Sequence, residues 1–389
     1  MLSWILALFW WVVAFRLYLA IRRVASLADE PLGPEPRGAP AAPLAGLSVV
    51  VAASNEADHV EEALSSLLQV DYPDLEVVAV NDRSTDATGE ILDRMARLDP
   101  RLTVVHVREL PPGWLGKTHA LQRGAERARH SLLLFTDADV HFSPDSLRRA
   151  VGAMLRRGAD HLVVSPYVVT RSFWETAFVS YFNVLFQLRF QPDLADRPGH
   201  PAYLGVGAFN MLRAEVYRAV GGHGPVALDV TDDMSLGRLV KRSGYRPMVL
   251  NSGGLVRVRW MVGLAGIIGG LEKNAYAGTD YSMSTVLAAC AWILATTLGT
   301  VLCFDQAAGG LAVGGMLLCG ALAASMMGLP RWGGALFPVT GPLFCYVLLR
   351  SAWLTERRGG VVWRGTFYPL PELREFLRRQ QLGGKGNPG

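Results

Sequence analysis

The sequence predicts an α/β domain with a mostly parallel sheet, flanked by apolar helices that span a membrane. Between residues 45 and 255, short β-branched runs such as LSVVVAA and LEVVAV alternate with helical patterns such as EADHVEEALSSLLQV. Continuous apolar strands separated by amphipathic helices are typical of a parallel sheet covered on both faces. At both ends of the chain stand long runs with almost no charge, and about 20 such residues suffice to cross a bilayer.

The composition agrees with a membrane protein and excludes some other classes. Half of the 389 residues are hydrophobic, and the formal net charge of +4 is too small to indicate nucleic-acid binding. Arginines cluster beside the apolar runs, as they do at membrane surfaces. The four cysteines all fall in the apolar C-terminal third, with no metal-ligand spacing, so we interpret them as small packed hydrophobes.

Residues 1–23 predict an N-terminal transmembrane anchor. A cleaved signal peptide would carry positive charge before its apolar run, whereas here Arg22 and Arg23 follow it. We therefore expect a retained helix with these arginines, and the domain after them, in the cytoplasm, at a bacterial plasma membrane. The Pro-rich residues 24–44 predict a linker to the domain at 45–255.

Residues 281–355 predict two to three further transmembrane helices. The third apolar run contains Pro338 and Pro342, and three full crossings would leave the basic tail, 356–389, outside the cell. We expect this run to re-enter the membrane; the alternative is that 256–280 crosses. Residues 256–280 are apolar but short, and predict an interfacial segment. The last residues, GGKGNPG, are expected to be disordered.

Acids and amides follow three of the predicted strands where each strand ends. Asn55 and Glu56 follow the first strand, Asp82 the second, and Asp137 and Asp139 a later one. Each alone could be a turn acid or a helix cap. Together they are expected at one edge of the sheet, where ligands bind in such folds. Carboxylates that repel one another attract a cation, and oxygen ligands suit Mg²⁺ or Mn²⁺, which commonly bridge to a diphosphate.

Five segments in this order carry a resemblance to a known family. They are VVVAASNEAD, DLEVVAVNDRSTDAT, GWLGKTHAL, LLLFTDADV and VTDDMSLGRLVKRSGYR. Over about 210 residues the chain resembles a family 2 glycosyltransferase with a GT-A fold, which is Rossmann-like. Its membrane arrangement is similar to the branch that glycosylates lipids, such as ceramide glucosyltransferase-like and hopanoid- or carotenoid-associated enzymes.

The resemblance implies a role for each matching residue. Nucleotide-sugar binding is implied for Ala53, Glu56, Asp82, Lys117, Asp137, Arg259 and Trp260. A metal ion, Mg²⁺ or Mn²⁺, is implied at Asp139 and Asp137. Asp233 is implied as the catalytic base, and the acceptor side is implied for Gly207, Phe209, Asn210 and Asp232.

The chain departs from the family pattern at several places, one of which is Ala52, where Pro is common. Asn81-Asp82 stands where two aspartates are usual, which matters little if only the second contacts the base. The Arg259-Trp260 pair is present, but Val256 stands where the processive and ceramide branches carry Gln or Arg. This departure argues against a processive polysaccharide synthase, and leaves open whether the pair closes over the diphosphate.

These observations predict an inverting, metal-assisted transfer of a sugar, most simply from a UDP-sugar, to the hydroxyl of a membrane lipid. One alternative is a polyprenyl-phosphate sugar transferase, and another is a nucleotide-sugar-binding membrane scaffold without turnover. A transporter is disfavoured because ionisable residues are nearly absent from the apolar runs. A dinucleotide dehydrogenase is disfavoured because no G-x-G-x-x-G follows the first strand.

Overall fold

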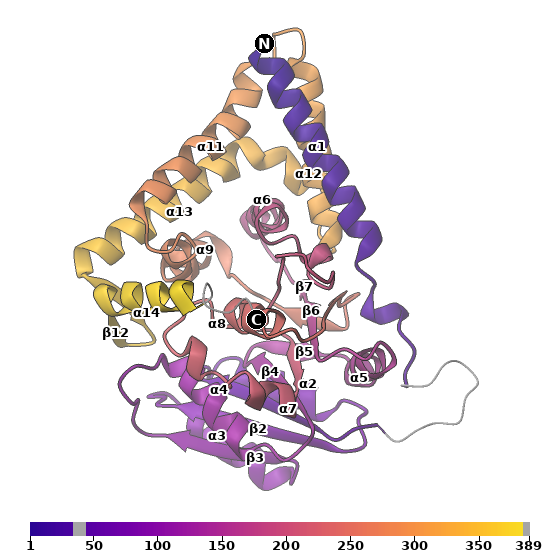
Figure 1. Cartoon of the computed structure of the whole chain (residues 1–389), viewed down its shortest axis with the longest axis vertical. Helices are drawn as coiled ribbons and strands as arrows, with labels where there is room; N and C mark the ends of the chain where they lie inside the picture. Colours follow the sequence, from indigo (N-terminus) through magenta and orange to yellow (C-terminus); the bar gives the residue numbers. More distant parts are fainter. Residues whose placement is uncertain (34–43, 384–389) are drawn as a thin grey trace. The chain divides into compact units, whose positions relative to one another are not determined.

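The chain folds into two units, here called the sheet unit and the helical unit (Figure 1). The structure is a computed structural model that describes residues 1–33 and 44–383. The sheet unit consists of residues 24–167 and 192–259, and the helical unit of 1–23, 168–191 and 260 onward. Part of the expected linker, residues 34–43, and the expected disordered end, residues 384–389, lie outside the described residues.

Seven strands form the main sheet of the sheet unit, in the order β3-β2-β1-β4-β8-β6-β9. In this order they are Leu102–Val107, Leu75–Asp82, Leu47–Ala53, Leu132–Asp137, Asn210–Arg213, His161–Ser165 and Pro247–Asn251. All neighbours pair in parallel except β8, which is antiparallel to both β4 and β6. The predicted mostly parallel sheet is confirmed, and the sequence pattern did not reveal its single antiparallel strand.

The reversed direction of β8 decides which segments reach the carboxyl edge of the sheet. At that edge Ala52 of β1 lies beside Val80 of β2 and Asp137 of β4. Because β8 runs the opposite way, it begins there, with Asn210 paired to Phe135 of β4. The loop that precedes β8 is therefore delivered to the edge at which the parallel strands end.

Helices and a small second sheet complete the sheet unit. The helices are α2 (Val60–Leu68), α3 (Thr88–Leu98), α4 (Gly116–Arg127), α5 (Ser146–Arg156), α7 (Ala214–Ala219) and α8 (Asp232–Arg242). The second sheet has the order β5-β10-β7, from Val140–Phe142, Val256–Val258 and Tyr167–Val168. Residues of α4, α7 and α8 pack with β1, β4 and β8 in one apolar cluster that includes Val50, Phe135, Tyr217 and Leu236.

The helical unit contains four helices that are long and apolar enough to cross a membrane. They are α1 (Leu2–Arg23), α11 (Met283–Leu302), α12 (Gly309–Met326) and α13 (Phe337–Arg358), the last preceded by the 3₁₀ helix η4 (Arg331–Leu336). The outward face of α1 is apolar, with Trp4, Leu8, Trp11 and Phe15 about half exposed or more. Exposed apolar faces on long helices fit a lipid surround, so the predicted count of one N-terminal and two to three C-terminal helices is confirmed.

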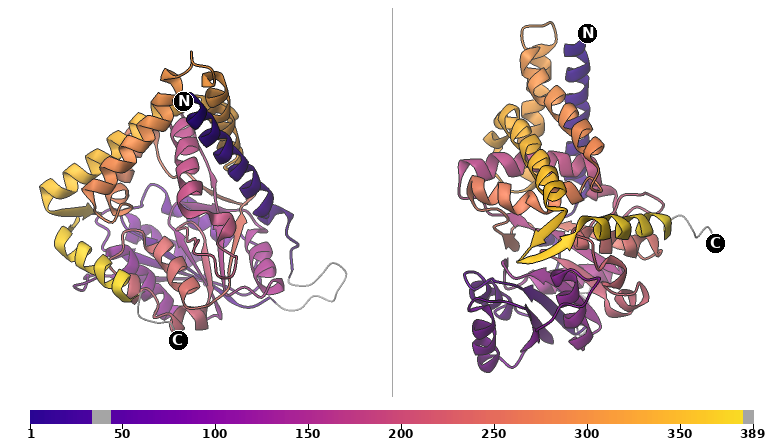
Figure 2. Two further views of the ribbon diagram at one scale, coloured as in Figure 1. Left: turned by 45° about the horizontal axis from the view of Figure 1, so that its top comes forward. Right: turned by 90° about the vertical axis from the view of Figure 1, so that its left-hand side faces the viewer.

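Small residues let these helices approach closely. A Cβ on Gly315 of α12 would lie 2.9 Å from the Cβ of Trp10 on α1, so the two backbones are nearly in contact. Figure 2 shows α1 and α12 running beside each other in both views. The Trp10 indole also donates to Thr300 of α11 at 2.9 Å, and its ring lies 6.2 Å from the ring of Phe337. Such small-residue contacts are typical of helix packing in membranes.

The direction of α13 follows from its contacts with α11. Gly341 packs on Thr297 near the end of α11, whereas Ser351 accepts a hydrogen bond from the Tyr276 N–H ahead of the start of α11. The helix therefore runs antiparallel to α11, and its last turn lies on the side where α11 begins. Between α12 and α13, the backbone of Gly334 meets that of Gly320, in the middle of α12. This path supports the expected re-entry of the third apolar run, whose membrane topology stays a prediction.

The helical unit also contains α6 (Phe173–Phe190) and a pair of short helices after the sheet unit. Helix α6 packs against α12, with Asn183 donating to the Ala323 carbonyl at 3.0 Å, although its sequence falls inside the α/β region. The expected interfacial segment forms α9 (Gly263–Glu272) and α10 (Asn274–Ala277). At about 15 Å, α9 is too short to cross a hydrocarbon core of about 30 Å.

The first residues of the expected linker are bound to the sheet unit. Ser26 bridges to Asn251 at the end of β9, and Arg149 of α5 donates to the Ala28 carbonyl at 3.0 Å. The Glu30 carboxylate pairs with Arg156 at 2.6 Å. These contacts bind the described first part of the expected linker to the sheet unit.

The chain ends in a hairpin and a helix within the helical unit. Strands β11 (Gly360–Trp363) and β12 (Thr366–Pro369) pair antiparallel, and α14 (Leu370–Gly383) follows. The Arg374 guanidinium pairs with Glu356 and donates to the Tyr281 carbonyl at 2.9 Å. Part of the expected basic tail is therefore ordered against α13 and the residues before α11.

A buried histidine makes the stability of the sheet unit sensitive to acid. His161 has no exposed surface, and burial lowers its pKa to about 4, against about 6.5 in an unfolded chain. Between these values the unfolded chain binds the extra proton, so stability falls as the pH drops from about 6.5 to 4, by up to about 1.4 kcal/mol per pH unit. Thermal unfolding in detergent across this range measures the slope, which should be shallower in His161→Gln. Exposed His59→Gln should keep the wild-type slope; an unchanged slope in His161→Gln would contradict the assignment.

Candidate functional site

Three glycines bring the loop before β8 against the start of α8. A Cβ on Gly205 would overlap the backbone carbonyl of Asp233, and a Cβ on Gly237 would overlap the carbonyl of Leu204. A Cβ on Gly207 would crowd the Asp137 carboxylate. Only glycine allows backbone to approach this closely, so the loop, α8 and the end of β4 form one packed cluster.

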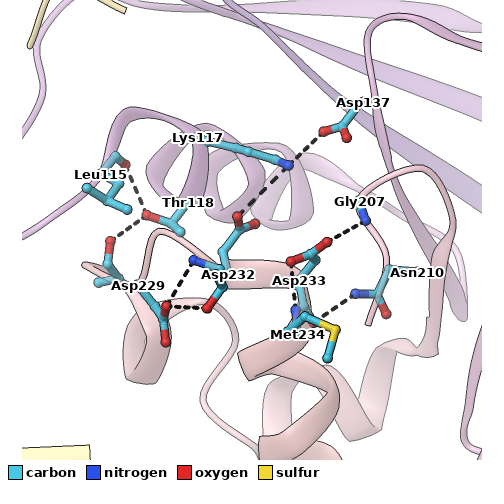
Figure 3. A network of polar contacts seen from close by, with 12 residues as sticks. Leu115, Lys117, Thr118, Asp137, Gly207, Asn210, Asp229, Asp232, Asp233 and Met234 are labelled. Atoms are coloured by element: carbon cyan, nitrogen blue, oxygen red, sulfur yellow. Dashed lines mark hydrogen bonds and ion pairs between the residues drawn. The ribbon is translucent and has the colours of Figure 1, made fainter. Parts of the chain in front are cut away.

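Asp233 lies in the first turn of α8 with its carboxylate held from two directions (Figure 3). The Gly207 N–H donates to Oδ2 at 2.7 Å, and the Met234 N–H donates to Oδ1 at 2.8 Å. Burial raises the pKa of Asp233, against the opposing charge of Lys117, and the negative charge of Asp137 adds to the increase. A carboxylate with a raised pKa is a better proton acceptor than an ordinary surface acid.

Lys117 is the cation of this cluster. Its Nζ lies 2.7 Å from Asp137 Oδ1 and 3.9 Å from Asp232 Oδ1, as Figure 3 shows. Burial alone would lower the pKa of Lys117, but the charges of Asp137, Asp232 and Asp233 outweigh that effect and raise it. Lys117 therefore stays charged and partly balances three carboxylates from β4 and α8.

Asp139 lies in the turn after β4 and carries charge that this lysine does not fully balance. Burial raises the pKa of Asp139 to about 7, and the negative charges of Asp137 and Glu56 contribute. An added cation would relieve this repulsion, and carboxylate oxygens are the donors that Mg²⁺ and Mn²⁺ prefer. Among the described residues no three His, Cys, Asp or Glu side chains gather closely enough to hold a metal ion by themselves. The carboxylates of Asp137 and Asp139 are therefore suitable ligands for a cation that takes its other ligands from outside the protein.

Asp82 ends β2 and is almost fully buried, with only 4% of its surface exposed. Its carboxylate accepts two hydrogen bonds from its neighbour Arg83, at 2.8 and 3.1 Å. The backbone of Arg83 is in the left-handed region at φ 52°, which turns its side chain back toward Asp82. Gly116, at the start of α4, leaves no room for a Cβ beside this pair. Ala53, in the adjacent strand, is buried.

The predicted acceptor-side residues Phe209 and Asn210 are buried in the structure. Phe209 has no exposed surface, and its ring lies 6.3 Å from that of Phe142. The Asn210 amide donates to the Asp233 carbonyl at 3.4 Å, and its oxygen lies 2.5 Å from His161 Nε2. Because the Asp233 carbonyl can only accept, the Asn210 oxygen faces His161, whose Nε2 must carry the proton. The Asn210 side chain therefore supports the backbone of Asp233, whereas the Phe209 ring packs beside Phe142.

Asp229 belongs to the site, and the sequence interpretation did not include it. Its carboxylate accepts from the Thr231 N–H at 2.9 Å, the Thr231 hydroxyl at 2.8 Å and the Ser235 hydroxyl at 2.5 Å. It thereby caps the turn that enters α8 and fixes the direction of Asp232 and Asp233. The signal in the sequence is Asp-x-Thr immediately before a helix, which is typical of an Asx turn.

The predicted pair Arg259 and Trp260 falls on the boundary between the two units. Arg259 is the last residue of the sheet unit, and Trp260 the first of the third segment of the helical unit. The ring of Trp260 lies 4.7 Å from that of Phe182 on α6. Closure of this pair over a diphosphate stays a prediction.

Comparison with known proteins finds a family match over part of the chain. Residues 48–221 match the family described as glycosyl transferase family 2. Over 111 residues the chain is 31% identical to the putative teichuronic acid biosynthesis glycosyltransferase TuaG of Bacillus subtilis, covering 28% of this chain and 42% of that protein. Over 102 residues it is 32% identical to the poly-beta-1,6-N-acetyl-D-glucosamine synthase of Staphylococcus epidermidis, covering 26% and 23%. The chain thus spans less than half the length of these relatives.

A solved structure with a similar fold is the mannosyltransferase PcManGT from Pyrobaculum calidifontis, in complex with GDP-Man and Mn²⁺. It matches over the whole of both chains with a TM-score of 0.51 and 19% identity, which shows the fold alone. The expected GT-A fold and the expected glycosyltransferase class are both supported by these comparisons. The family match ends before Asp232 and Asp233, so the interpretation of α8 rests on its own geometry.

The close contact of Gly205 with α8 makes a testable prediction. We expect Gly205→Ala to lower the thermal midpoint by several degrees, because a Cβ there has no space beside the Asp233 carbonyl. The matched control is Gly224→Ala, since nothing lies within 4 Å of a Cβ at that position. Thermal unfolding of both variants in detergent measures the difference, and equal midpoints would contradict the packing described.

Proposed function

We propose that the chain, whose residues 48–221 form a family 2 glycosyltransferase domain, is an inverting enzyme that transfers a sugar from a nucleoside diphosphate to the hydroxyl of a membrane lipid. The observation that carries this proposal is the Asp233 carboxylate, held at 2.7 Å by the Gly207 N–H beside the Lys117–Asp137 ion pair. A proton acceptor and a cation in one cluster, at the carboxyl edge of the sheet, are the two groups that sugar transfer requires.

Asp233 acts as the general base in this proposal. It takes the proton of the acceptor hydroxyl as the hydroxyl oxygen attacks the anomeric carbon, and the bond from that carbon to the diphosphate oxygen breaks. Attack from the face opposite the leaving group inverts the anomeric configuration. The N–H groups of Gly207 and Met234 fix the orientation of the carboxylate, so the proton moves along a preset direction.

The leaving diphosphate gains negative charge as this bond breaks. Lys117 is placed to stabilise that charge electrostatically, since its ammonium group stays protonated among the carboxylates. Asp137 and Asp139 would hold Mg²⁺ or Mn²⁺, which supplies further positive charge to the diphosphate when bound. Asp82 and Arg83 offer an acceptor and donors at the end of β2, where a pyrimidine base, and hence a UDP-sugar, would bind.

A lipid acceptor is proposed because the enzyme domain is continuous with apolar helices. Four helices are long and apolar enough to span a membrane, and large apolar side chains cover their outer faces. The basic ends of α1 and α13, at Arg22–Arg23 and Arg357–Arg358, favour the cytoplasm by the positive-inside tendency. A re-entrant η4–α13 segment reconciles this tendency with the three apolar helices that follow the domain. We place the protein in a bacterial plasma membrane with the sheet unit in the cytoplasm.

The two other candidates differ from this proposal in their products. A polyprenyl-phosphate transferase would use the same site on a phosphate oxygen, which needs no general base because it is already ionised. The raised pKa and fixed geometry of Asp233 therefore favour a hydroxyl acceptor. A scaffold would bind the nucleotide sugar and release no product.

Replacement of the proposed base tests the reaction. We expect Asp233→Asn to lower kcat by about 10²- to 10⁴-fold, because an amide cannot accept the proton. Binding of the nucleoside diphosphate, measured by calorimetry, should change little. The assay uses detergent-solubilised full chain, a panel of radiolabelled nucleotide sugars, and extracted membrane lipids with Mg²⁺ or Mn²⁺.

The matched control and the product chemistry separate the alternatives. Asp196, an exposed aspartate, should tolerate replacement by Asn with full turnover. A labelled lipid stable to mild acid supports a hydroxyl acceptor, whereas an acid-labile product identifies a phosphate acceptor. Turnover that survives in Asp233→Asn would refute the assigned base, and nucleotide binding without turnover from any lipid source would favour the scaffold.

The proposed metal site has a readout independent of turnover. We expect Asp139→Asn to weaken Mn²⁺ binding in the presence of nucleoside diphosphate by about tenfold or more, because one of two protein carboxylates is lost. Electron paramagnetic resonance of free Mn²⁺ measures the affinity, with Asp196→Asn as the control. An affinity equal to that of the wild type would show that the ion, if bound, is held elsewhere.

A further inference from the structure

The hairpin after α13 has an apolar pair on its outward face. Val361 and Tyr368 pair across the strands and are buried, with 4% and 6% of their surfaces exposed. The next pair, Val362 and Phe367, points to the opposite face and is 48% and 49% exposed. The outer face of a two-stranded sheet is normally polar, because it meets water. A cross-strand apolar pair there indicates contact with something other than water.

The turn of this hairpin carries an arginine in an unfavourable backbone conformation. Arg364 has φ 47° and Gly365 has φ 77°, the geometry of a type I′ turn. Asn or Gly is preferred at the first of these positions, since a positive φ crowds other side chains. The tip therefore holds an exposed arginine where local folding alone would favour another residue.

The hairpin is held firmly to the end of α13. Only Gly359 separates Arg358, the last residue of α13, from β11, and the Leu370 N–H closes the base of the hairpin on the Gly359 carbonyl at 2.8 Å. The Lys273 ammonium lies 3.5 Å from the centre of the Trp363 ring. These contacts fix the direction in which the outer face points.

The residues around this junction have the composition of a membrane interface. Residues 350–369 contain four arginines and one glutamate, and two of these arginines, Arg350 and Arg358, pair with Glu272. Trp353, on the last turns of α13, is 53% exposed, and the Arg357 guanidinium lies 5.0 Å from the centre of its ring. Tryptophan and arginine together are enriched at the headgroup level of bilayers, and clustered arginines attract anionic lipids.

We propose that the β11–β12 hairpin docks into the headgroup layer of an anionic phospholipid bilayer, the membrane that α13 enters. Val362 and Phe367 reach the boundary with the acyl chains, and Arg364 contacts lipid phosphate. The proposal rests on the insertion of α13 and does not depend on the sugar-transfer reaction. It assigns to the tail a direct membrane contact in addition to the long helices.

Depth-dependent fluorescence quenching tests this contact in the full chain reconstituted into vesicles. An environment-sensitive fluorophore is attached at Val362→Cys, with Thr366→Cys on the opposite face of the same hairpin as the matched control. The four native cysteines are buried, and wild-type protein treated identically reports any labelling of them. We expect quenching by shallow spin-labelled lipids to be at least about twofold stronger at position 362 than at 366.

The lipid charge gives a second readout. With phosphatidylglycerol present, quenching at 362 should exceed that in phosphatidylcholine alone, and Arg364→Asn should remove the difference. Asn suits a type I′ turn, so this variant keeps the hairpin while losing the charge. Water-like emission at 362 would overturn the proposal, as would emission shifted to the blue without lipid quenching, which indicates cover by a second copy or another protein. Extraction of the protein from membranes by alkaline carbonate would show that α13 is not inserted, and would therefore also overturn the proposal. This outcome is independent of the sugar-transfer assay.

Discussion

The close approach between the loop before β8 and the first turn of α8 is the contact on which the site depends. Gly205 lies against the backbone carbonyl of Asp233, and Gly207 gives its N–H to the carboxylate of the same residue. Without these contacts the acid would sit at a helix start facing solvent. With them it becomes a half-buried group of fixed orientation, whose pKa is raised mainly by desolvation.

The balance of charge in the site follows from this packing. The packing of α8 beside the end of β4 brings Asp137, Asp232 and Asp233 close to one another, with Lys117 as their shared partner. One ammonium cannot neutralise all of them. Nearby, burial raises the pKa of Asp139, and the negative charges of Asp137 and Glu56 raise it further. The proposed reaction would use this imbalance, because a bound cation and a diphosphate leaving group would interact with these charges.

The helical unit obeys a different constraint, since its stability comes from contact between small residues and not from the exclusion of apolar surface. Gly315 lets α12 meet α1 at Trp10, and Gly341 lets α13 meet Thr297 of α11. The outward faces stay apolar because lipid, not water, surrounds them. In the hairpin of this unit, the exposed cross-strand pair Val362 and Phe367 is also apolar.

The sequence by itself determined the elements whose signal is local. Apolar strand runs, helical spacing and long uncharged segments predicted the parallel sheet and the four membrane-type helices, because hydrophobic periodicity reports burial directly. The sequence also predicted that Asp82 and Asp137 lie at one edge of the sheet, because parallel strands end at the same edge.

Only tertiary contacts between residues far apart in the chain decided three other features. These are the direction of β8, the inclusion of α6 in the helical unit and the reversal of the chain before α13. The same is true of Arg83 and Asp229, whose roles depend on a left-handed backbone turn and on a cap that forms only once α8 is packed. Local patterns specify which face of an element is buried, but only tertiary packing specifies what that face lies against. The orientation of the Asp233 carboxylate depends on this packing, so the sequence alone could not predict it.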